Sequence, residues 1–146
     1  MVLVLPAGHN VLVYRFDHRF PEKQAKATRL MREGIDRDDL RMAHQSLIEF
    51  VAAVTRPIGR GAKPTGLLSP VEAVREVEEL LAQFTVLYPN DDVVRTALRG
   101  MSAYQLSWFD AHLWAYAECY GLDELISEDF QSNRVYGRVR VRNPFE

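Results

Sequence analysis

The chain has 146 residues, 47% of them hydrophobic, which is enough for one domain with a single core over residues 1–146. Its formal net charge of −2 and isoelectric point near 6.1 exclude a generally basic nucleic-acid binder, although local basic patches stay open. Because no apolar run approaches the roughly 20 residues of a membrane span, and no signal-peptide pattern is visible, we expect no membrane insertion and a cytoplasmic location.

The front of the chain predicts a strand followed by a short helix. Val2–Leu5 is an aliphatic run typical of a central parallel strand, and Pro6 ends it because proline cannot donate to the ladder. A turn at Ala7-Gly8 follows. Asn10 is then a favourable N-cap for a short helix through Tyr14.

Two further helices flank a second strand. Pro21 opens the first of them, since proline at an early helical position loses no hydrogen bond, and Gly34 predicts its end. Arg41–Ala43 predicts a short strand. Ser46 then predicts the start of a helix over Leu47–Thr55.

The middle of the chain predicts a loop, a helix, a strand and another helix. Residues 56–68 carry two prolines, three glycines and three cations without an acid, which indicates a mobile surface loop, either a solvated connector or a substrate contact. Ser69–Glu72 has the pattern of a capping box and opens a helix to about Gln83. Thr85–Leu87 predicts a strand, and Asn90 caps a helix through about Met101.

Residues 107–130 have the clearest pattern. Asp110 opens an apolar helix that Gly121 ends; this helix contains Cys119, the only cysteine, which excludes an internal disulfide and which we expect to be buried. Glu124–Ile126 then predicts a buried strand. Helix, strand and acid are half of a parallel α/β unit, and sites form at the C-terminal ends of such strands, which places Asp129 at the edge of a site.

The C-terminal part alternates basic and aliphatic residues over Arg138–Val141, which predicts an edge strand with its arginines outward. The aromatic residues between 104 and 120 are expected in the core or in a dimer interface rather than in a base-stacking platform. The arginines of the C-terminal part are either solvated or contacts to RNA phosphate, and they are Arg134, Arg138, Arg140 and Arg142.

Several segments occur in a characteristic order and spacing: Asn10–Tyr14, Pro21-Glu22-Lys23, Ser46–Phe50 (SLIEF), Asp110 within SWFDAHLWAYAECYG, Ser127-Glu128-Asp129 and the tail Val139–Phe145. Together they resemble the PIN domains, and most of all the VapC-type ribonuclease toxins of bacterial toxin–antitoxin pairs. The resemblance spans nearly the whole chain. It implies an α/β/α sandwich around a central parallel sheet.

The resemblance also implies a function. It predicts an endoribonuclease that uses magnesium or manganese to cleave RNA, forms a homodimer and has an antitoxin partner. Glu49, Asp110 and Asp129 would be the catalytic carboxylates and the metal ligands, with Asn10 and Ser127 as supporting polar groups. Magnesium prefers oxygen ligands, and carboxylates brought together from distant segments would supply them.

Each carboxylate also has a purely structural interpretation. Glu49 is the fourth residue of the capping-box pattern that begins at Ser46, Asp110 ends a similar pattern that begins at Ser107, and Asp129 could cap a turn. The capping and metal interpretations are compatible, because a helix N-terminus favours an ionised carboxylate.

One position departs from the family pattern. The family has an aspartate two residues before Asn10, and this chain has Gly8 there. His9 and Asp17 are candidates to replace the missing ligand, although Asp17 lies off the pattern. The alternative is a degenerate PIN domain that binds RNA or an antitoxin-like partner without cleavage. We therefore expect Gly8 to weaken metal binding.

Overall fold

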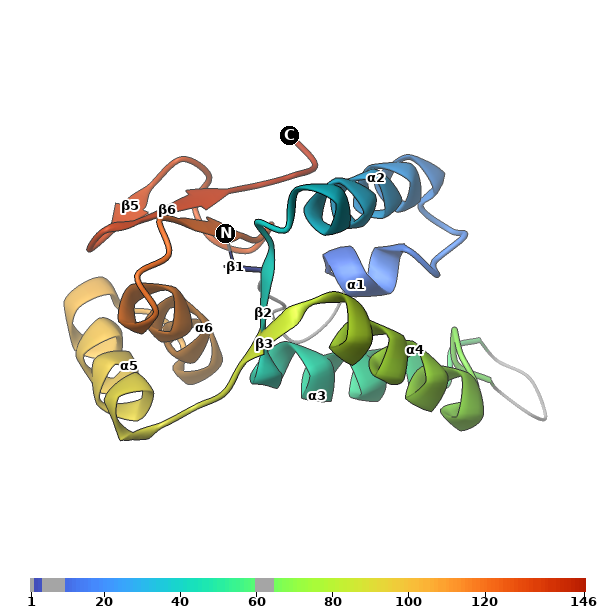
Figure 1. The fold of residues 1–146 in the computed structure, drawn as a ribbon, viewed down its shortest axis with the longest axis horizontal. Coiled ribbons are helices and arrows are strands. Elements are labelled where there is room, and N and C mark those ends of the chain that lie inside the picture. The colour runs from blue at the N-terminus through green and yellow to red at the C-terminus, as the bar shows by residue number, and fades with distance from the viewer. Residues whose placement is uncertain (1, 4–9, 60–64) are drawn as a thin grey trace.

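The computed structural model describes residues 2–3, 10–59 and 65–146, and within them it shows a mixed α/β fold (Figure 1). None of the described helices is both long and apolar enough to cross a membrane. The helices are α1 (Val11–Tyr14), α2 (Pro21–Arg37), α3 (His44–Thr55), α4 (Pro70–Gln83), α5 (Asp91–Tyr104) and α6 (Trp108–Cys119). The strands are β1 (Val2–Leu3), β2 (Arg41–Ala43), β3 (Thr85–Leu87), β4 (Glu124–Ile126), β5 (Val135–Tyr136) and β6 (Val139–Arg142).

The described strands form one small sheet in the order β3-β2-β1-β4-β6-β5. All neighbouring pairs are parallel except β5 and β6, which are antiparallel. The bounds predicted from the sequence for β2, β3 and β4 are confirmed. β1 lies between β2 and β4, as expected of a central strand, and the remainder of its predicted range lies outside the described residues.

Two hydrophobic cores are built on this sheet. Successive residues of a strand point to opposite faces, and the fully buried neighbours Leu125 and Ile126 accordingly belong to different cores. Ile126 joins the core that includes Phe50 of α3 and Leu80 of α4. Leu125 joins the core that includes Trp114 of α6. Figure 1 shows α5 and α6 together on the left and α1 to α4 on the right.

Four of the N-terminal caps predicted from the sequence are confirmed, those at Asn10, Ser69, Asn90 and Ser107. At Asn10, Asn90 and Ser107 the side chain accepts a hydrogen bond from the backbone amide three residues later. Ser69 and Glu72 form a complete capping box at the start of α4. These bonds satisfy amides that have no partner inside the helix, so local sequence fixes where four of the helices begin.

The predicted end of α2 at Gly34 is wrong. The helix continues to Arg37, and Asp38 ends it in the left-handed conformation with φ of 51°. Gly34 serves packing instead, because a Cβ at this position would lie 2.7 Å from Cδ2 of Leu40. The glycine therefore permits a close approach between the helix and the segment that leads into β2. Helix α5 likewise runs three residues past its predicted end at Met101.

The predicted start of α3 is also wrong. The helix begins at His44, with Ala43 as its N-cap, two residues before Ser46. Ser46 is fully buried inside the helix and does not open it. The capping-box interpretation of Glu49 is thereby excluded, and its carboxylate is not committed to the start of the helix.

The C-terminal part differs from prediction in two respects. The predicted edge strand, β6, lies between β4 and β5, and β5 was not expected because two residues are too few to show a pattern. Cys119, predicted to be buried, is exposed at the end of α6, where its thiol donates to the Thr96 hydroxyl at 3.3 Å.

Candidate active site

Glu49 presents a half-buried carboxylate in the middle of α3. Its Oε1 accepts a hydrogen bond from Nε2 of Gln45 at 2.9 Å. Its Oε2 is buried and has no hydrogen-bond partner among the described residues. Burial raises the pKa of Glu49, the bond from Gln45 lowers it, and the negative charge of Asp110 raises it. A carboxylate in this state is stabilised by a proton or a cation.

Gln45 connects Glu49 to the start of α6. The same amide nitrogen that donates to Glu49 also donates to the backbone oxygen of Phe109 at 3.3 Å. Phe109 directly precedes Asp110, whose own amide donates to the Ser107 hydroxyl at 3.1 Å. One side chain therefore brings the α3 carboxylate next to the N-terminus of α6.

Asp129 follows β4 in the segment Ser127-Glu128-Asp129. Ser127 is buried, its amide donates to a carbonyl of β6 at 3.1 Å, and its hydroxyl accepts from the Asp129 amide at 3.2 Å. Although Asp129 as a residue is exposed, desolvation of its carboxylate is the largest cause of its raised pKa. The charges of Glu128 and Asp110 raise this pKa further, whereas Lys23 lowers it. Asp129 thus lies past the C-terminal end of a parallel strand, at the position expected of a site residue.

Asp110 is the electrostatic link between the other two carboxylates. Its charge acts on Glu49 and on Asp129, so both lie within its electrostatic reach. Within residues 2–3, 10–59 and 65–146, no group of three or more His, Cys, Asp or Glu side chains is arranged to hold a metal ion. The donor chemistry nevertheless fits a divalent cation, because such an ion would pair the orphaned oxygen of Glu49 and relieve the repulsion. The shared three-carboxylate site stays a prediction.

The structure also describes two further residues singled out in the sequence, the supporting group Asn10 and the possible replacement ligand Asp17. Asn10 is buried and caps α1 through a bond from the Val13 amide at 3.0 Å. Asp17 is fully buried and forms an ion pair with Arg19 at 2.8 Å, so its carboxylate already has a cation and is a poor replacement for the missing ligand. Gly8 and His9 lie outside the described residues.

A cluster that the sequence did not reveal lies beside Asp129. Nζ of Lys23, in the first turn of α2, donates to Oε2 of Glu128 at 2.8 Å and to the Tyr14 hydroxyl at 3.1 Å. The same hydroxyl donates to Oε1 of Glu128 at 2.8 Å. The bond to Glu128 is the largest cause of the raised pKa of Lys23. Lys23 and Glu128 are 105 positions apart, so no local pattern could indicate the pair.

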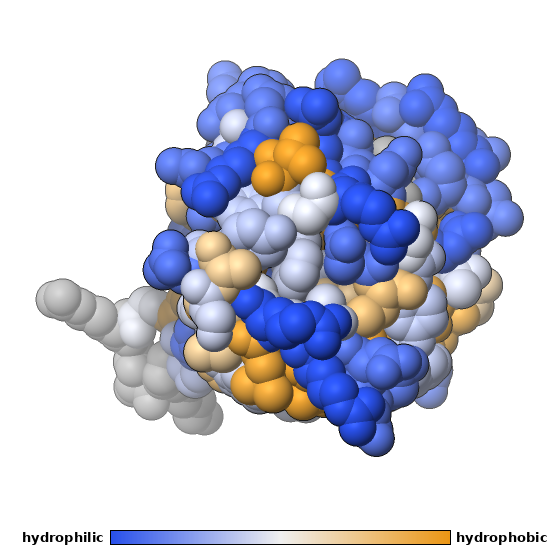
Figure 2. All heavy atoms as spheres, turned by 90° about the vertical axis from the view of Figure 1, so that its left-hand side faces the viewer, coloured by the Kyte–Doolittle hydropathy of each residue, from blue (hydrophilic) through white to orange (hydrophobic). Residues whose placement is uncertain are grey.

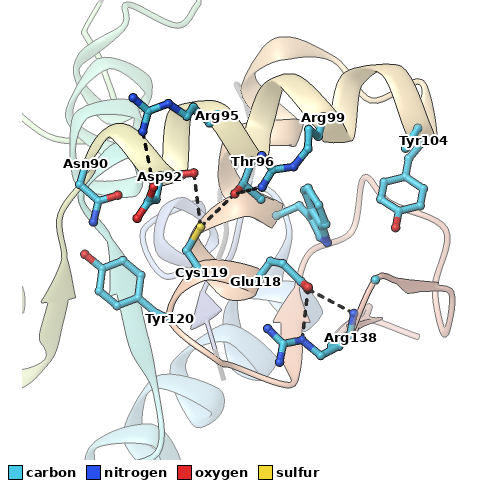
Figure 3. A pocket seen from close by; sticks show the side chains of 13 residues that line it. Asn90, Asp92, Arg95, Thr96, Arg99, Tyr104, Glu118, Cys119, Tyr120 and Arg138 are labelled. Carbon is cyan, nitrogen blue, oxygen red and sulfur yellow. Dashed lines mark hydrogen bonds and ion pairs between the residues drawn. The ribbon is translucent and has the colours of Figure 1, made fainter.

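A pocket of about 600 Å³ lies elsewhere, between α5, the end of α6 and the turn at Gly137 (Figure 3). Two of its three arginines have anionic partners, Arg95 with Asp92 at 3.6 Å and Arg138 with Glu118 at 3.3 Å. The third, Arg99, donates to the Thr96 hydroxyl at 3.0 Å. Figure 2 shows that hydrophilic side chains cover most of the side of the molecule where α5 and β5 lie. None of the three candidate carboxylates lines this pocket, which is therefore separate from the candidate site.

Comparison with known proteins gives the family and the fold. The PIN domain family matches residues 9–138. VapC20 of Mycobacterium tuberculosis, a sarcin-ricin loop cleaving toxin, has a TM-score of 0.57 and 16% identity, over 86% of this chain and 87% of that chain. A toxin–antitoxin complex from Klebsiella pneumoniae has a TM-score of 0.53 and 16% identity, over 73% of this chain and 75% of that chain. The search of curated proteins found no match.

Proposed function

The chain belongs to the PIN-domain family, and from this premise we propose that it is a VapC-type endoribonuclease that hydrolyses RNA with the help of a divalent metal ion. Nucleases are typical of the family. The observation that carries the proposal is the match of the PIN-domain family over residues 9–138. It is supported by the two hydrogen bonds of Gln45, which bring the Glu49 carboxylate next to the start of α6, where Asp110 lies. The charge of Asp110 raises the pKa of Glu49 and of Asp129, and carboxylates with perturbed pKa values are characteristic of functional sites.

The proposed roles follow from the contacts. Glu49, Asp110 and Asp129 would hold magnesium or manganese, which when bound neutralises charge on the phosphodiester and activates water. Gln45 holds the Glu49 carboxylate toward the N-terminus of α6 through its two hydrogen bonds. Ser127 fixes the backbone of Asp129 through its hydroxyl. These contacts orient the carboxylates before substrate arrives, which lowers the cost of ordering them.

The proposal extends to the architecture and the partners. We propose that residues 1–146 form a single three-layer α/β/α domain, which the two cores on this sheet support. A homodimer is supported by three exposed aromatic side chains at the two ends of α6, which are Trp108, Phe109 and Tyr120. An antitoxin partner is supported by the structural likeness to a chain of a toxin–antitoxin complex.

A second candidate function is a degenerate PIN domain that binds RNA or an antitoxin-like protein without cleaving. Gly8 favours it, because glycine supplies no side-chain oxygen where the family has an aspartate. Asp17 does not compensate, since it is paired with Arg19. With one ligand fewer, magnesium would keep more of its water and bind less tightly.

One experiment separates the two functions. The purified chain is incubated with mixed cellular RNA in magnesium, manganese or EDTA, beside Asp110→Asn as the site variant and Asp123→Asn as an exposed acidic control. Metal-dependent cleavage that Asp110→Asn loses and Asp123→Asn keeps supports the nuclease. RNA binding without cleavage by any chain supports the degenerate domain. Equal cleavage by Asp110→Asn contradicts the proposed site.

A further inference from the structure

Lys23 occupies a position that its own helix disfavours. It is the third residue of α2, where the helix macrodipole favours anions over cations. Its ammonium is stabilised instead by groups outside the helix. It lies 4.7 Å from the ring centroid of Tyr14 and 5.2 Å from that of Phe145, and it forms an ion pair with Glu128 at 2.8 Å. Three segments outside α2 thus hold one cation in a defined place.

The held ammonium keeps donor capacity. A lysine ammonium has three N–H donors, and the described acceptors are two, Oε2 of Glu128 and the Tyr14 hydroxyl. The Lys23 side chain is 37% exposed, whereas that of Glu128 is 18% exposed. The ion pair is therefore open to solvent on the lysine side, and one N–H can donate to an incoming group.

The neighbourhood of Lys23 indicates what that group is. The ammonium donates to Oε2 of Glu128 at 2.8 Å, and Glu128 directly precedes Asp129, so the ammonium stands at the edge of the carboxylates. An RNA phosphate that approaches these carboxylates is repelled by them. A fixed cation at their edge offsets that repulsion without reorganisation when the ligand arrives.

We propose that Lys23 is a phosphate-binding residue of the candidate site and donates its third N–H to a non-bridging oxygen of the RNA backbone beside Asp129. The proposal rests on the proposed function, since it takes RNA as the ligand. Glu128 and Tyr14 act as positioning residues that hold the ammonium, and Glu128 also moderates its charge. The competing interpretation is a structural clamp in which the pair only fastens α2 to the segment after β4.

The two interpretations differ in the sign of one effect. If the pair is only a clamp, loss of either partner acts in the same direction. If Lys23 binds phosphate, Lys23→Gln weakens RNA binding, whereas Glu128→Gln strengthens it, because the amide can still accept from the ammonium and no longer neutralises it. Lys26→Gln is the matched control, since Lys26 lies one turn further along α2 and donates to the Phe145 carbonyl at 3.2 Å.

The test measures binding of a fluorescent single-stranded RNA by anisotropy, in EDTA to prevent cleavage, over a series of KCl concentrations. We expect Lys23→Gln to weaken binding roughly tenfold and to reduce the slope of log affinity against log salt by about 0.7, the value of one phosphate contact on a single strand. Lys23→Met keeps an apolar side chain over the rings of Tyr14 and Phe145, and it should weaken binding and reduce the salt slope by similar amounts. Thermal denaturation of each variant confirms that it is folded.

Three results would overturn the proposal. An unchanged salt slope in both Lys23 variants, or a change equal to that of Lys26→Gln, removes the phosphate contact while leaving the proposed nuclease intact. A change of the same sign in Lys23→Gln and Glu128→Gln favours the structural clamp. A natural chain that binds no RNA at any salt concentration overturns the RNA function itself, and this inference with it.

Discussion

Replacing Glu49 by glutamine should make the protein more stable and less active. The substitution removes a charge from a half-buried carboxylate whose Oε2 has no described hydrogen-bond partner and which the charge of Asp110 repels. Glutamine keeps the shape and can still accept the hydrogen bond from Gln45. Its neutral amide carries no charge for that of Asp110 to repel.

The size of the effect follows from burial. A buried polar atom left without a partner costs about 1–3 kcal/mol. Glu49 is only half-buried, so solvent screening places it at the low end of that range. We therefore expect Glu49→Gln to raise the free energy of unfolding by about 1 kcal/mol near neutral pH, which corresponds to an increase in Tm of about 2–4 °C for a chain of this length.

The pH dependence has a defined sign. Because the folded-state pKa of Glu49 is raised above the ordinary value of a glutamate, the folded chain binds this proton more tightly than the unfolded chain does. The contribution of Glu49 to stability is therefore greatest below the unfolded pKa and is lost as the pH rises through the folded pKa. The advantage of Glu49→Gln should therefore be small below the unfolded pKa and should grow as the pH rises through the folded pKa.

The assay is chemical denaturation of the natural protein and of Glu49→Gln, from acidic to neutral pH, with metal-dependent RNA cleavage measured in parallel. Magnesium should raise the Tm of the natural chain more than that of Glu49→Gln, because a ligand stabilises the state that binds it. Glu79→Gln, on the exposed face of α4, is the control and should change stability by less than about 0.5 kcal/mol. A Glu49→Gln protein that is less stable at neutral pH would refute the reasoning and make the carboxylate structural.

Three further predictions concern other parts of the chain. Gly8→Asp should bind magnesium more tightly by calorimetry and cleave RNA faster, because it adds a carboxylate ligand. Equal magnesium affinity and equal cleavage rate of the natural chain would show that the absence of an aspartate at position 8 does not weaken the site. Phe109→Asp should convert a homodimer to a monomer in light scattering, since Phe109 is 57% exposed, and a natural chain that is monomeric at micromolar concentration would contradict the dimer. Gly100→Ala should cost about 1–3 kcal/mol in denaturation, because its Cβ would lie 2.7 Å from Cε3 of Trp114; unchanged stability would show that the indole moves freely.

The sequence predicted those elements whose boundaries depend on neighbouring residues. Ser69 and Glu72 start α4 through a reciprocal cap, and Asn90 starts α5 through one bond to a nearby amide. The end of α2 was wrongly predicted at Gly34, because the sequence shows that a glycine is present but not that the side chain of Leu40 packs on it. The start of α3 was wrongly predicted at Ser46, because a serine at a favourable spacing is also compatible with a buried position inside a helix.

For the candidate site, the sequence likewise indicated the residues but not their contacts with distant segments. The order of the acidic residues along the chain indicated Glu49, Asp110 and Asp129 as candidates, and none of the three has lost that role through a structural contact. The groups that act on them, Gln45 and Lys23, were not predictable, because their bonds to Phe109 and Glu128 join segments that only the fold brings together. Family resemblance supplied the residues, and tertiary contacts supply their electrostatics.

The three-carboxylate site can be tested without measuring activity, through Asp110→Asn. Asparagine keeps the backbone amide that donates to Ser107, so the start of α6 should be preserved. The charge of Asp110 contributes to the raised pKa of Glu49 and of Asp129, so both pKa values should fall in the variant. Each should fall only in part, because desolvation is the larger cause at both positions and remains.

Titration of the side-chain carboxyl carbons by NMR reports the two residues separately, with Asp123→Asn as the exposed control. A fall at both positions would show that one charge acts on both carboxylates, as a single metal-holding site requires. A fall at Glu49 alone would leave a pair joined through Gln45 and would remove Asp129 from the site. No change at either position would separate all three carboxylates, and the proposed catalytic arrangement would then be wrong whatever the RNA assay shows.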